Sequence, residues 1–166
     1  MNRRFAGSLV AGMMFAGMMI AGAAFAQAEQ PFSTFQHDSS QPLEIVSDRL
    51  GISQAAQTAE FVGNVEVIQG TLTMRAQQMT VTYDQSSGDI RQLIATGDVL
   101  LSSGSEAAEG QRANYNVDTG FLVMEGDVLL TQGQSALSAQ SMRINLNEGT
   151  GEFSGRVRTV FVPQSQ

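Results

Sequence analysis

Residues 121–132 read FLVMEGDVLLTQ. In this stretch apolar side chains stand at every second position or more often, on both sides of the pair Gly126-Asp127. Apolar alternation of this kind, bounded by Gly and Asp, is typical of half-buried β-strands. The glycine suits a backbone corner with positive φ, and an aspartate beside it suits the same conformation. The stretch therefore predicts two short strands that meet at a corner.

The Gly–Asn/Asp–Val motif recurs along the chain. Its four copies begin, at intervals of 34, 29 and 29 residues, at Gly63, Gly97, Gly126 and Gly155. In the fourth copy Arg156 takes the place of Asn or Asp, and the longer first interval indicates a five-residue insertion around residues 84–91. A regular repeat of this length indicates a solenoid-like stack, because one repeat cannot bury its apolar face alone.

The repeats also predict the number of strands. Each repeat is interpreted as four short strands of about 5–8 residues. Three strands before Gly63, four in each of three repeats and one after Gly155 give sixteen. No segment after residue 26 shows a sustained helical period. The sequence therefore predicts an all-β, antiparallel, solenoid-like stack of about sixteen strands.

The N-terminal segment is interpreted as a targeting signal. Arg3 and Arg4 precede an apolar run over residues 5–25, and residues 24–26 form an Ala-x-Ala pattern. These features predict a secretory signal peptide, residues 1–26, cut after Ala26. An uncleaved membrane anchor is the alternative, because about 20 apolar residues can span a bilayer. Beyond it we expect a flexible arm over residues 27–41, a β-region over 42–163 and a tail over 164–166.

The charge of the chain excludes one class of partner. The sequence has nine Arg, no Lys and sixteen acidic residues, a net charge of −7. Loss of Arg3 and Arg4 with the signal peptide changes this charge to −9. A nucleic-acid partner requires a basic surface, and the sequence offers none. There is no Cys, so stability must come from packing and backbone hydrogen bonds.

Candidate catalytic or metal-binding groups are few. His37 is the sole histidine and lies in the expected arm, so neither an N/S-type metal site nor Ser/His/Asp catalysis is expected. Asp98 and Asp127 recur at equivalent corners and are interpreted as turn residues rather than a catalytic pair. Glu106 and Glu109 are interpreted as solvated charges at a rim. We therefore expect neither enzymatic activity nor a cofactor.

The side chains predicted to face inward are mostly Val, Leu, Ile and Met. They form either an ordinary dry core or an interior soft enough to admit acyl chains, and the adaptable Met fits both interpretations. Periodicity alone does not separate the two. The inward set comprises Val65, Val67, Leu72, Met74, Met79, Val81, Tyr83, Val99, Leu101, Tyr115, Val117, Met124, Val128, Leu130, Ile144 and Leu146.

Three further stretches carry a family resemblance. Residues 41–48 read QPLEIVSD, residues 61–72 read FVGNVEVIQGTL, and residues 156–163 read RVRTVFVP. Together with the repeat and the signal peptide, they resemble the OstA-like family of periplasmic lipopolysaccharide transport proteins over about residues 41–163. The resemblance implies a V-shaped β-jellyroll of sixteen antiparallel strands. It also implies periplasmic localisation and an apolar groove that binds the lipid A part of lipopolysaccharide and conveys it from the inner to the outer membrane.

The resemblance implies roles for particular residues. The family's lipid-contacting positions fall on Leu43 and Ile45 near the N-terminal edge, and on Tyr115 and Val117 inside the groove. Members join end to end with one another, with an inner-membrane bridging component at the N-terminal edge and with an outer-membrane assembly protein at the C-terminal edge. The edge residues would be Leu43, Glu44, Ile45, Val46, Val157, Arg158, Thr159, Val160, Phe161 and Val162. Because this chain has no Lys, contacts that basic residues make in the family do not carry over.

Other functions remain open at this point. A structural or adhesive β-solenoid with a dry core would show the same periodicity. A solenoid enzyme acting on a polysaccharide is disfavoured by the lack of an acid/base constellation. Within the same fold, the N-terminal domain of the outer-membrane assembly protein and the membrane-anchored bridging component are the nearest alternatives. The expected cleavage of the signal peptide argues against the anchored component.

Overall fold

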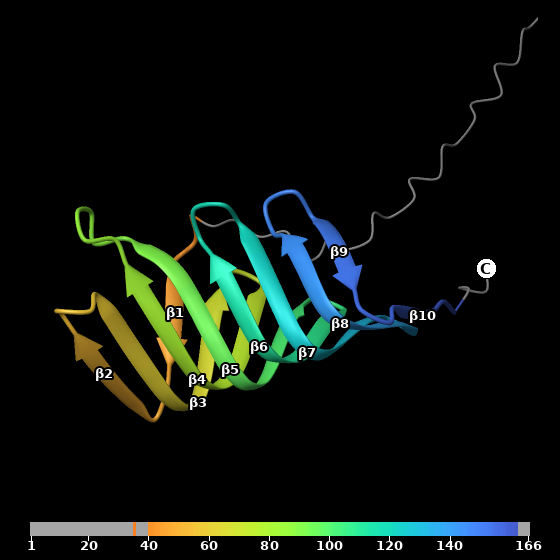
Figure 1. The fold of residues 1–166 in the computed structure, drawn as a ribbon, viewed down its shortest axis with the longest axis horizontal. Helices are drawn as coiled ribbons and strands as arrows, with labels where there is room; N and C mark the ends of the chain where they lie inside the picture. The colour runs from red at the N-terminus through yellow and green to blue at the C-terminus, as the bar shows by residue number, and fades with distance from the viewer. Residues whose placement is uncertain (1–34, 36–39, 163–166) are drawn as a thin grey trace, which may run out of the picture.

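The computed structural model describes residue 35 and residues 40–162 and shows one antiparallel sheet of ten strands (Figure 1). The strands are β1 (Leu43–Val46), β2 (Arg49–Ser53), β3 (Thr58–Gln69), β4 (Leu72–Tyr83), β5 (Ile90–Ser103), β6 (Glu106–Asn116), β7 (Phe121–Gln132), β8 (Ser135–Asn145), β9 (Thr150–Ser154) and β10 (Arg158–Val160). Consecutive long strands from β3 to β8 are neighbours in the sheet. The all-β, antiparallel prediction is confirmed.

Several predicted segments lie beyond this description. The signal peptide, its cleavage point after Ala26, the tail over residues 164–166 and nearly all of the arm fall outside the described residues. Within the described part, no helix has the length and apolar character needed to cross a membrane.

The long strands bend at the level of the repeat motif, which lies in β3, β5 and β7. In the pairing of β3 with β4, Val62 faces Gln78 and Val65 faces Ala76, so two residues, Gly63 and Asn64, stand opposite Gln77 alone. The register shifts in the same way at Gly97-Asp98 and at Gly126-Asp127. Two residues facing one form a β-bulge, which bends the strand and increases its twist. The predicted corner is therefore a bulge inside a continuous strand.

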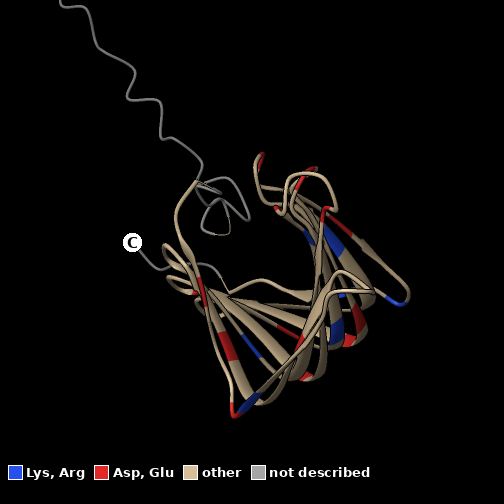
Figure 2. Cartoon of the chain, turned by 90° about the vertical axis from the view of Figure 1, so that its left-hand side faces the viewer, with Lys and Arg blue, Asp and Glu red and all other residues tan. Residues whose placement is uncertain are grey.

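The aligned bulges fold the sheet into a V. Viewed along the stack, the halves of the strands on either side of the bulges form the two arms of the V (Figure 2). Apolar side chains fill much of the space between the arms, which we call the trough. This shape also explains the strand number. The sequence predicts sixteen short strands, whereas the structure has ten. Six strands, β3 to β8, run through the corner without a break, and counting each of them as two halves beside the four short strands gives sixteen.

The corner requires glycine for two reasons. Gly97 has φ +82° and Asp98 has φ +47°, values in the left-handed region that glycine adopts without cost. A Cβ on Gly97 would also lie 2.9 Å from the Cβ of Gln77, whose side chain crosses the glycine. The Gln77 Nε2 then donates a hydrogen bond to Asp98 Oδ2 at 2.7 Å. A glutamine packed over glycine and bonded to aspartate thus holds the bend.

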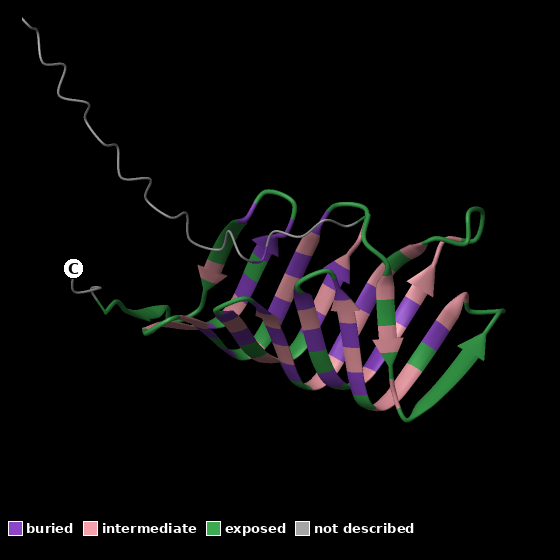
Figure 3. Ribbon diagram, turned by 180° about the vertical axis from the view of Figure 1, so that it is seen from behind, coloured by how far each residue is buried: buried purple, intermediate pink, exposed green. Residues whose placement is uncertain are grey.

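The end strands repeat this arrangement in broken form. At one end β1 pairs with the second half of β3 and β2 pairs with its first half, and Asp48 between them accepts a 2.9 Å hydrogen bond from Asn64 Nδ2. At the other end β9 and β10 pair with the two halves of β8. Strands β2 and β10 are exposed along their whole length (Figure 3). The sheet therefore ends in open edges on both sides.

The two rims of the trough differ in their turns. One rim has two-residue hairpins that begin with a glycine of positive φ, at Gly70, Gly104 and Gly133. The other rim has longer turns, linked by backbone hydrogen bonds such as Val117 N to Arg91 O and Leu146 N to Gly120 O. The turns of the second rim are therefore longer than those of the first, and the five-residue insertion of the first repeat lies on the second rim.

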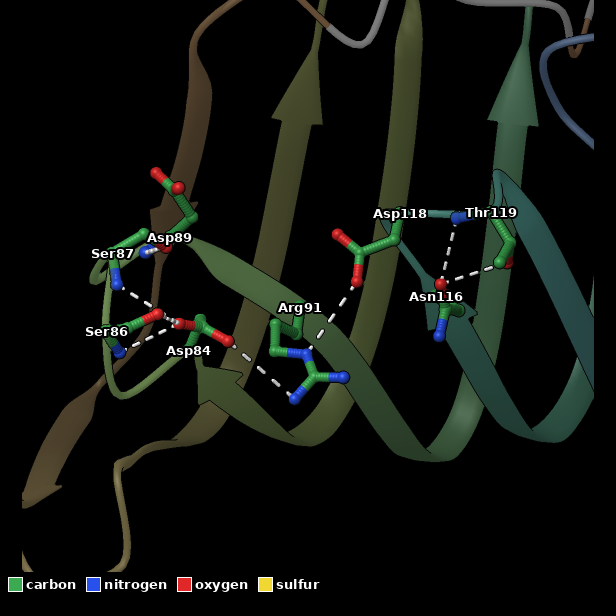
Figure 4. Close-up of polar contacts among 8 residues, drawn as sticks. All are labelled: Asp84, Ser86, Ser87, Asp89, Arg91, Asn116, Asp118 and Thr119. Atoms are coloured by element: carbon green, nitrogen blue, oxygen red, sulfur yellow. Dashed lines mark hydrogen bonds and ion pairs between the residues drawn. The ribbon is translucent and has the colours of Figure 1, made fainter.

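The inserted turn between β4 and β5 is organised by Asp84 (Figure 4). Its Oδ1 accepts hydrogen bonds from the Ser86 hydroxyl and from the backbone N–H groups of Ser86 and Ser87. These bonds, with the nearby charge of Arg91, lower the pKa of Asp84 from 3.8 to about 2. Arg91 lies between Asp84 Oδ2 at 3.8 Å and Asp118 Oδ2 at 3.7 Å, so it links two adjacent turns.

Replacing a corner glycine should cost more than replacing a turn glycine. In Gly88→Ala the φ of +78° imposes strain but nothing lies near the new Cβ, so a loss of about 1–2 kcal/mol is expected. Gly97→Ala adds the contact with Gln77 and should lose at least about 1 kcal/mol more. Urea unfolding of both variants measures the difference. Equal losses would show that packing against Gln77 does not matter.

The Asp84 turn should respond to acid in a defined range. Because the pKa in the folded protein is depressed, its contribution to stability is complete above the unfolded value and is lost as the pH falls through about 2. Carboxyl NMR should find that midpoint for Asp84, and Ser86→Ala should raise it. Ser87→Ala is the control, since the Ser87 hydroxyl accepts a hydrogen bond from the Asp89 backbone N–H instead. An unchanged midpoint in Ser86→Ala would contradict the assigned cause.

Candidate ligand-binding trough

The inner face of the V carries continuous apolar rows. The residues of a row come from successive strands and are paired in register, so each row runs along the trough. One row on the first arm comprises Ile45, Val67, Met74, Leu101, Ala108, Leu130 and Leu137. One row on the second arm comprises Phe61, Met79, Ala95, Ala113, Met124, Met142 and Phe153. Met79, Ala113 and Met142 therefore occupy equivalent positions in successive repeats.

All eighteen residues predicted to line a groove share this face. Four of them are partly buried against the hydrophobic cluster: Leu43, Ile45, Tyr83 and Val117. The other fourteen are buried within it: Val65, Val67, Leu72, Met74, Met79, Val81, Val99, Leu101, Tyr115, Met124, Val128, Leu130, Ile144 and Leu146. The structure thus places all eighteen side chains on the inner side of the sheet. Their contact with lipid remains a prediction.

In the middle of the trough the two arms touch. A small pocket there, of about 20 Å³, is lined from the first arm by Val67, Leu72 and Met74 and from the second by Leu93, Tyr115, Leu122 and Leu146, with Leu43 and Gln69 at its side. This volume holds little more than one water molecule. Burial also raises the pKa of the Tyr115 hydroxyl. The middle of the trough is thus a packed core, and an acyl chain could enter only if the arms separated.

At the C-terminal end the trough is open. A pocket of about 300 Å³ lies there, walled by Leu130, Gln132, Ser135, Ala136, Leu137, Phe153, Thr159 and Phe161. Its lining is mainly apolar, and Phe161 is 80% exposed. The volume is at the lower end of the range for small-molecule sites in proteins. This pocket is therefore the part of the trough that is ready to accept an apolar ligand without rearrangement.

The N-terminal end also presents apolar side chains. On β2, Leu50 is paired with Phe61 and Ile52 with Ala59, which places both on the inner face. They are nevertheless 54% and 72% exposed, because no further strand follows β2 on that side. Both ends of the trough thus expose apolar surface that a neighbouring molecule could cover.

Only some of the predicted edge residues lie in strands. Leu43 to Val46 form β1, with Leu43 and Ile45 turned inward and Glu44 and Val46 exposed. At the C-terminal end only Arg158–Val160 form a strand, β10, while Val157, Phe161 and Val162 lie outside it. Thr159 and Phe161 line the end pocket, and Arg158 and Val160 alternate with them.

Glu106 corrects one prediction. The sequence suggested a solvated rim charge, but Glu106 is 1% exposed. It begins β6 and shares the inner face with Ala108, which is fully buried. Its Oε1 accepts a 2.6 Å hydrogen bond from Gln132 Nε2, and its buried Oε2 has no hydrogen-bond partner among the described residues. Glu109, in contrast, is exposed as predicted.

Several inner residues escaped the sequence analysis. Leu137 lines the end pocket, and the alternation of β8 could have indicated it. Phe35 lies in the segment expected to be a flexible arm, yet its side chain is 0% exposed and belongs to the hydrophobic cluster. A single aromatic residue outside any alternating run gives no periodic signal. Its place in the core could not be inferred from the pattern.

Among the described residues, every Arg, Asp and Glu except Glu106 is exposed or only partly buried. Arg75 bonds Glu66 on the outside of the sheet at 2.7 Å, and Arg143 stacks on the Phe121 ring at 4.1 Å. Among residue 35 and residues 40–162, no group of three or more His, Cys, Asp or Glu could hold a metal ion. The chemistry offered by the trough is therefore apolar contact with a few hydrogen-bonding groups.

The closed middle and the open end should differ in their sensitivity to truncation. Leu122→Ala removes a fully buried side chain and should destabilise the protein by about 2–5 kcal/mol. Leu137→Ala removes a partly buried side chain that lines the end pocket and should cost less than about 1.5 kcal/mol. Thermal or urea unfolding compares them. Similar losses in the two variants would indicate that the end pocket is packed as tightly as the middle.

Comparison with known proteins agrees with this architecture. A family model described as "LptA/(LptD N-terminal domain) LPS transport protein" matches residues 44–150, more than half of the chain. An uncharacterized protein of Rhizobium meliloti (strain 1021) is 37% identical over 109 residues, which are 61% of this chain and 59% of that protein. The chain thus spans less than two thirds of this curated relative.

A solved structure shows the same fold. The crystal structure of LptH, "the LptA homologous periplasmic component of the conserved lipopolysaccharide transport device from Pseudomonas aeruginosa", superimposes with a TM-score of 0.69. The match covers 76% of this chain and 99% of that one, at 15% sequence identity. With the family match over the repeat region, we conclude that this chain belongs to the family of LptA and LptD N-terminal domain lipopolysaccharide transport proteins.

Proposed function

We propose that this protein is a periplasmic carrier that binds the lipid A part of lipopolysaccharide in its trough and conveys it from the inner to the outer membrane. The family to which it belongs serves lipopolysaccharide transport and is not a family of enzymes. The observation that carries the proposal is the end pocket of about 300 Å³, which continues the apolar rows of the interior to an open mouth.

The energetics of acyl chains favour a sheltered route. Exposing an acyl chain to water costs roughly 0.8 kcal/mol per CH₂. A chain of about a dozen carbons therefore costs on the order of 10 kcal/mol, and a lipid with several chains cannot cross an aqueous space unaided. A V-shaped trough shelters the chains between its arms and leaves the polar part of the lipid in water. Passage through the middle requires the arms to separate around the packed core.

The exposed edges support a bridge rather than a shuttle. Strands β1 and β2 at one end, and β9 and β10 at the other, have no further strand on their outer sides among the described residues, and Ile52 and Phe161 expose apolar surface beside them. Unpaired edges are normally protected, or they pair with another strand. We propose that the N-terminal edge docks on an inner-membrane bridging component and the C-terminal edge on an outer-membrane assembly protein. Further copies of this chain would join end to end between them.

A dry structural or adhesive β-solenoid is the second candidate. The observation that favours it is the pocket of about 20 Å³ in the middle of the trough, which leaves no room for a ligand in this conformation. The two functions differ in whether the interior ever opens. A probe placed on an interior side chain therefore separates them.

Photo-crosslinking in cells tests the carrier function. A photoreactive residue at Leu137, in the end pocket, and one at Tyr115, in the closed middle, should both capture lipopolysaccharide. Thr73 is the matched control, because it lies between the inward Leu72 and Met74 and faces outward. Capture would be detected as a lipopolysaccharide-positive band of higher mass.

The outcomes separate the two candidates. Capture at Leu137 and Tyr115 above the level of Thr73 supports passage along the trough. Capture at Leu137 without Tyr115 would contradict passage, since the ligand would occupy the end pocket alone. No capture above the Thr73 level at either site would leave the dry solenoid as the better description.

A further inference from the structure

The inner edge of the hairpin rim carries polar side chains, unlike most of the interior. The inward positions nearest this rim hold Gln69 on β3, Ser103 on β5, Glu106 on β6 and Gln132 on β7, with the apolar Leu72 on β4 among them, and all but the partly buried Gln132 are buried. Along the opposite rim the corresponding inward side chains are Tyr83, Ile90, Val117 and Leu146, which pack on the hydrophobic cluster. The trough therefore has one polar lip and one apolar lip.

Glu106 is the exceptional member of this polar lip. Its register partner Gln132 donates to Oε1, and no hydrogen bond reaches Oε2 within the described part of the chain. Leaving a buried acceptor without a partner is costly, more so for a charged group. Such groups are rare in folded proteins, and each one requires an explanation. A ligand that supplies the missing donor is one explanation that the surroundings support.

The surroundings connect Glu106 to the open end of the trough. Gln132, which bonds Glu106, itself lines the end pocket together with Ser135 and Thr159. The remaining wall of that pocket is apolar, with Leu130, Leu137 and Phe153. Glu106 itself is not part of this wall, so the polar end of a chain in the pocket would reach Glu106 past Gln132.

We propose that Glu106 and Gln132 form a recognition site for the polar group next to an acyl chain. The ligand class is an amphiphile with a hydroxyl or an amide N–H next to its chain, and that group donates a hydrogen bond to Glu106 Oε2. Gln132 holds the carboxylate in position through Oε1. This site rests on the proposed carrier function. It adds that the hairpin rim of the trough determines the orientation of the bound amphiphile.

Two probes with equal chains test the site. N-dodecanoylethanolamine carries an amide N–H and a hydroxyl, and ethyl dodecanoate carries neither donor. The wild-type protein should bind the first about tenfold more tightly, the value of one hydrogen bond to a charged acceptor. Displacement of a fluorescent apolar dye by each probe measures the two affinities.

The decisive variant is Glu106→Gln. An amide at this position keeps the bond from Gln132 but presents an N–H donor where Oε2 lay, so the preference for N-dodecanoylethanolamine should disappear. Binding of ethyl dodecanoate should be unchanged, which also shows that the pocket is folded. Glu109→Gln removes the same charge from the exposed face of the same strand and should behave as wild type.

The possible results are distinguishable. Loss of the preference in Glu106→Gln alone supports the site. A preference that persists in Glu106→Gln overturns the proposed site, and Glu106 would then serve only to hold Gln132. The carrier function would still stand if lipopolysaccharide is captured at Leu137 and Tyr115. Failure of the wild-type protein to bind either probe, together with no capture of lipopolysaccharide, would overturn the carrier function and this site with it.

Discussion

The packing of a glutamine side chain across a Gly–Asp corner is the contact on which the architecture depends. Without the bulge at Gly97-Asp98 and its equivalents, β3 to β8 would form a flat sheet with one apolar face open to water. The bulges turn that face onto itself, and the repeat spacing aligns them so that one line of bends runs along the whole sheet. Burial of the interior is therefore a consequence of backbone geometry at a few positions, and Gln77 fills the space that the missing Cβ leaves.

Much of this could be predicted from the sequence. The alternation in residues 121–132 and the recurrence of the Gly–Asn/Asp–Val motif were enough to place most inward residues of the long strands, because a period of two leaves no choice once the register is known. The same pattern could not distinguish a corner between strands from a bulge inside a strand, since both need positive φ at Gly126 and Asp127. For this reason the sequence predicts sixteen short strands where the described residues form ten.

The parts that the sequence did not predict depend on contacts between arms or between distant segments. The alternation did not assign Glu106 to either face of the sheet, because a carboxylate next to a hairpin is ordinarily solvated. Its hydrogen bond with Gln132 accounts for its burial. The contact of the two arms around Tyr115 depends on the opening angle of the V, which no local pattern encodes. Phe35 fills part of the interior from outside the repeats, so the cluster that a lipid would enter already includes a ring from the chain's own N-terminal segment.

The meandering order of the strands has a consequence for size. Each 29-residue repeat adds two neighbouring strands, and strands in a sheet lie about 4.8 Å apart, so one repeat lengthens the trough by about 10 Å. The cross-section does not change, because every repeat brings the same corner and the same rows. Gain or loss of one repeat would therefore change the length of the trough by a fixed amount and leave its cross-section unchanged. A molecule of this design can change its length by whole repeats, with no redesign of its interior.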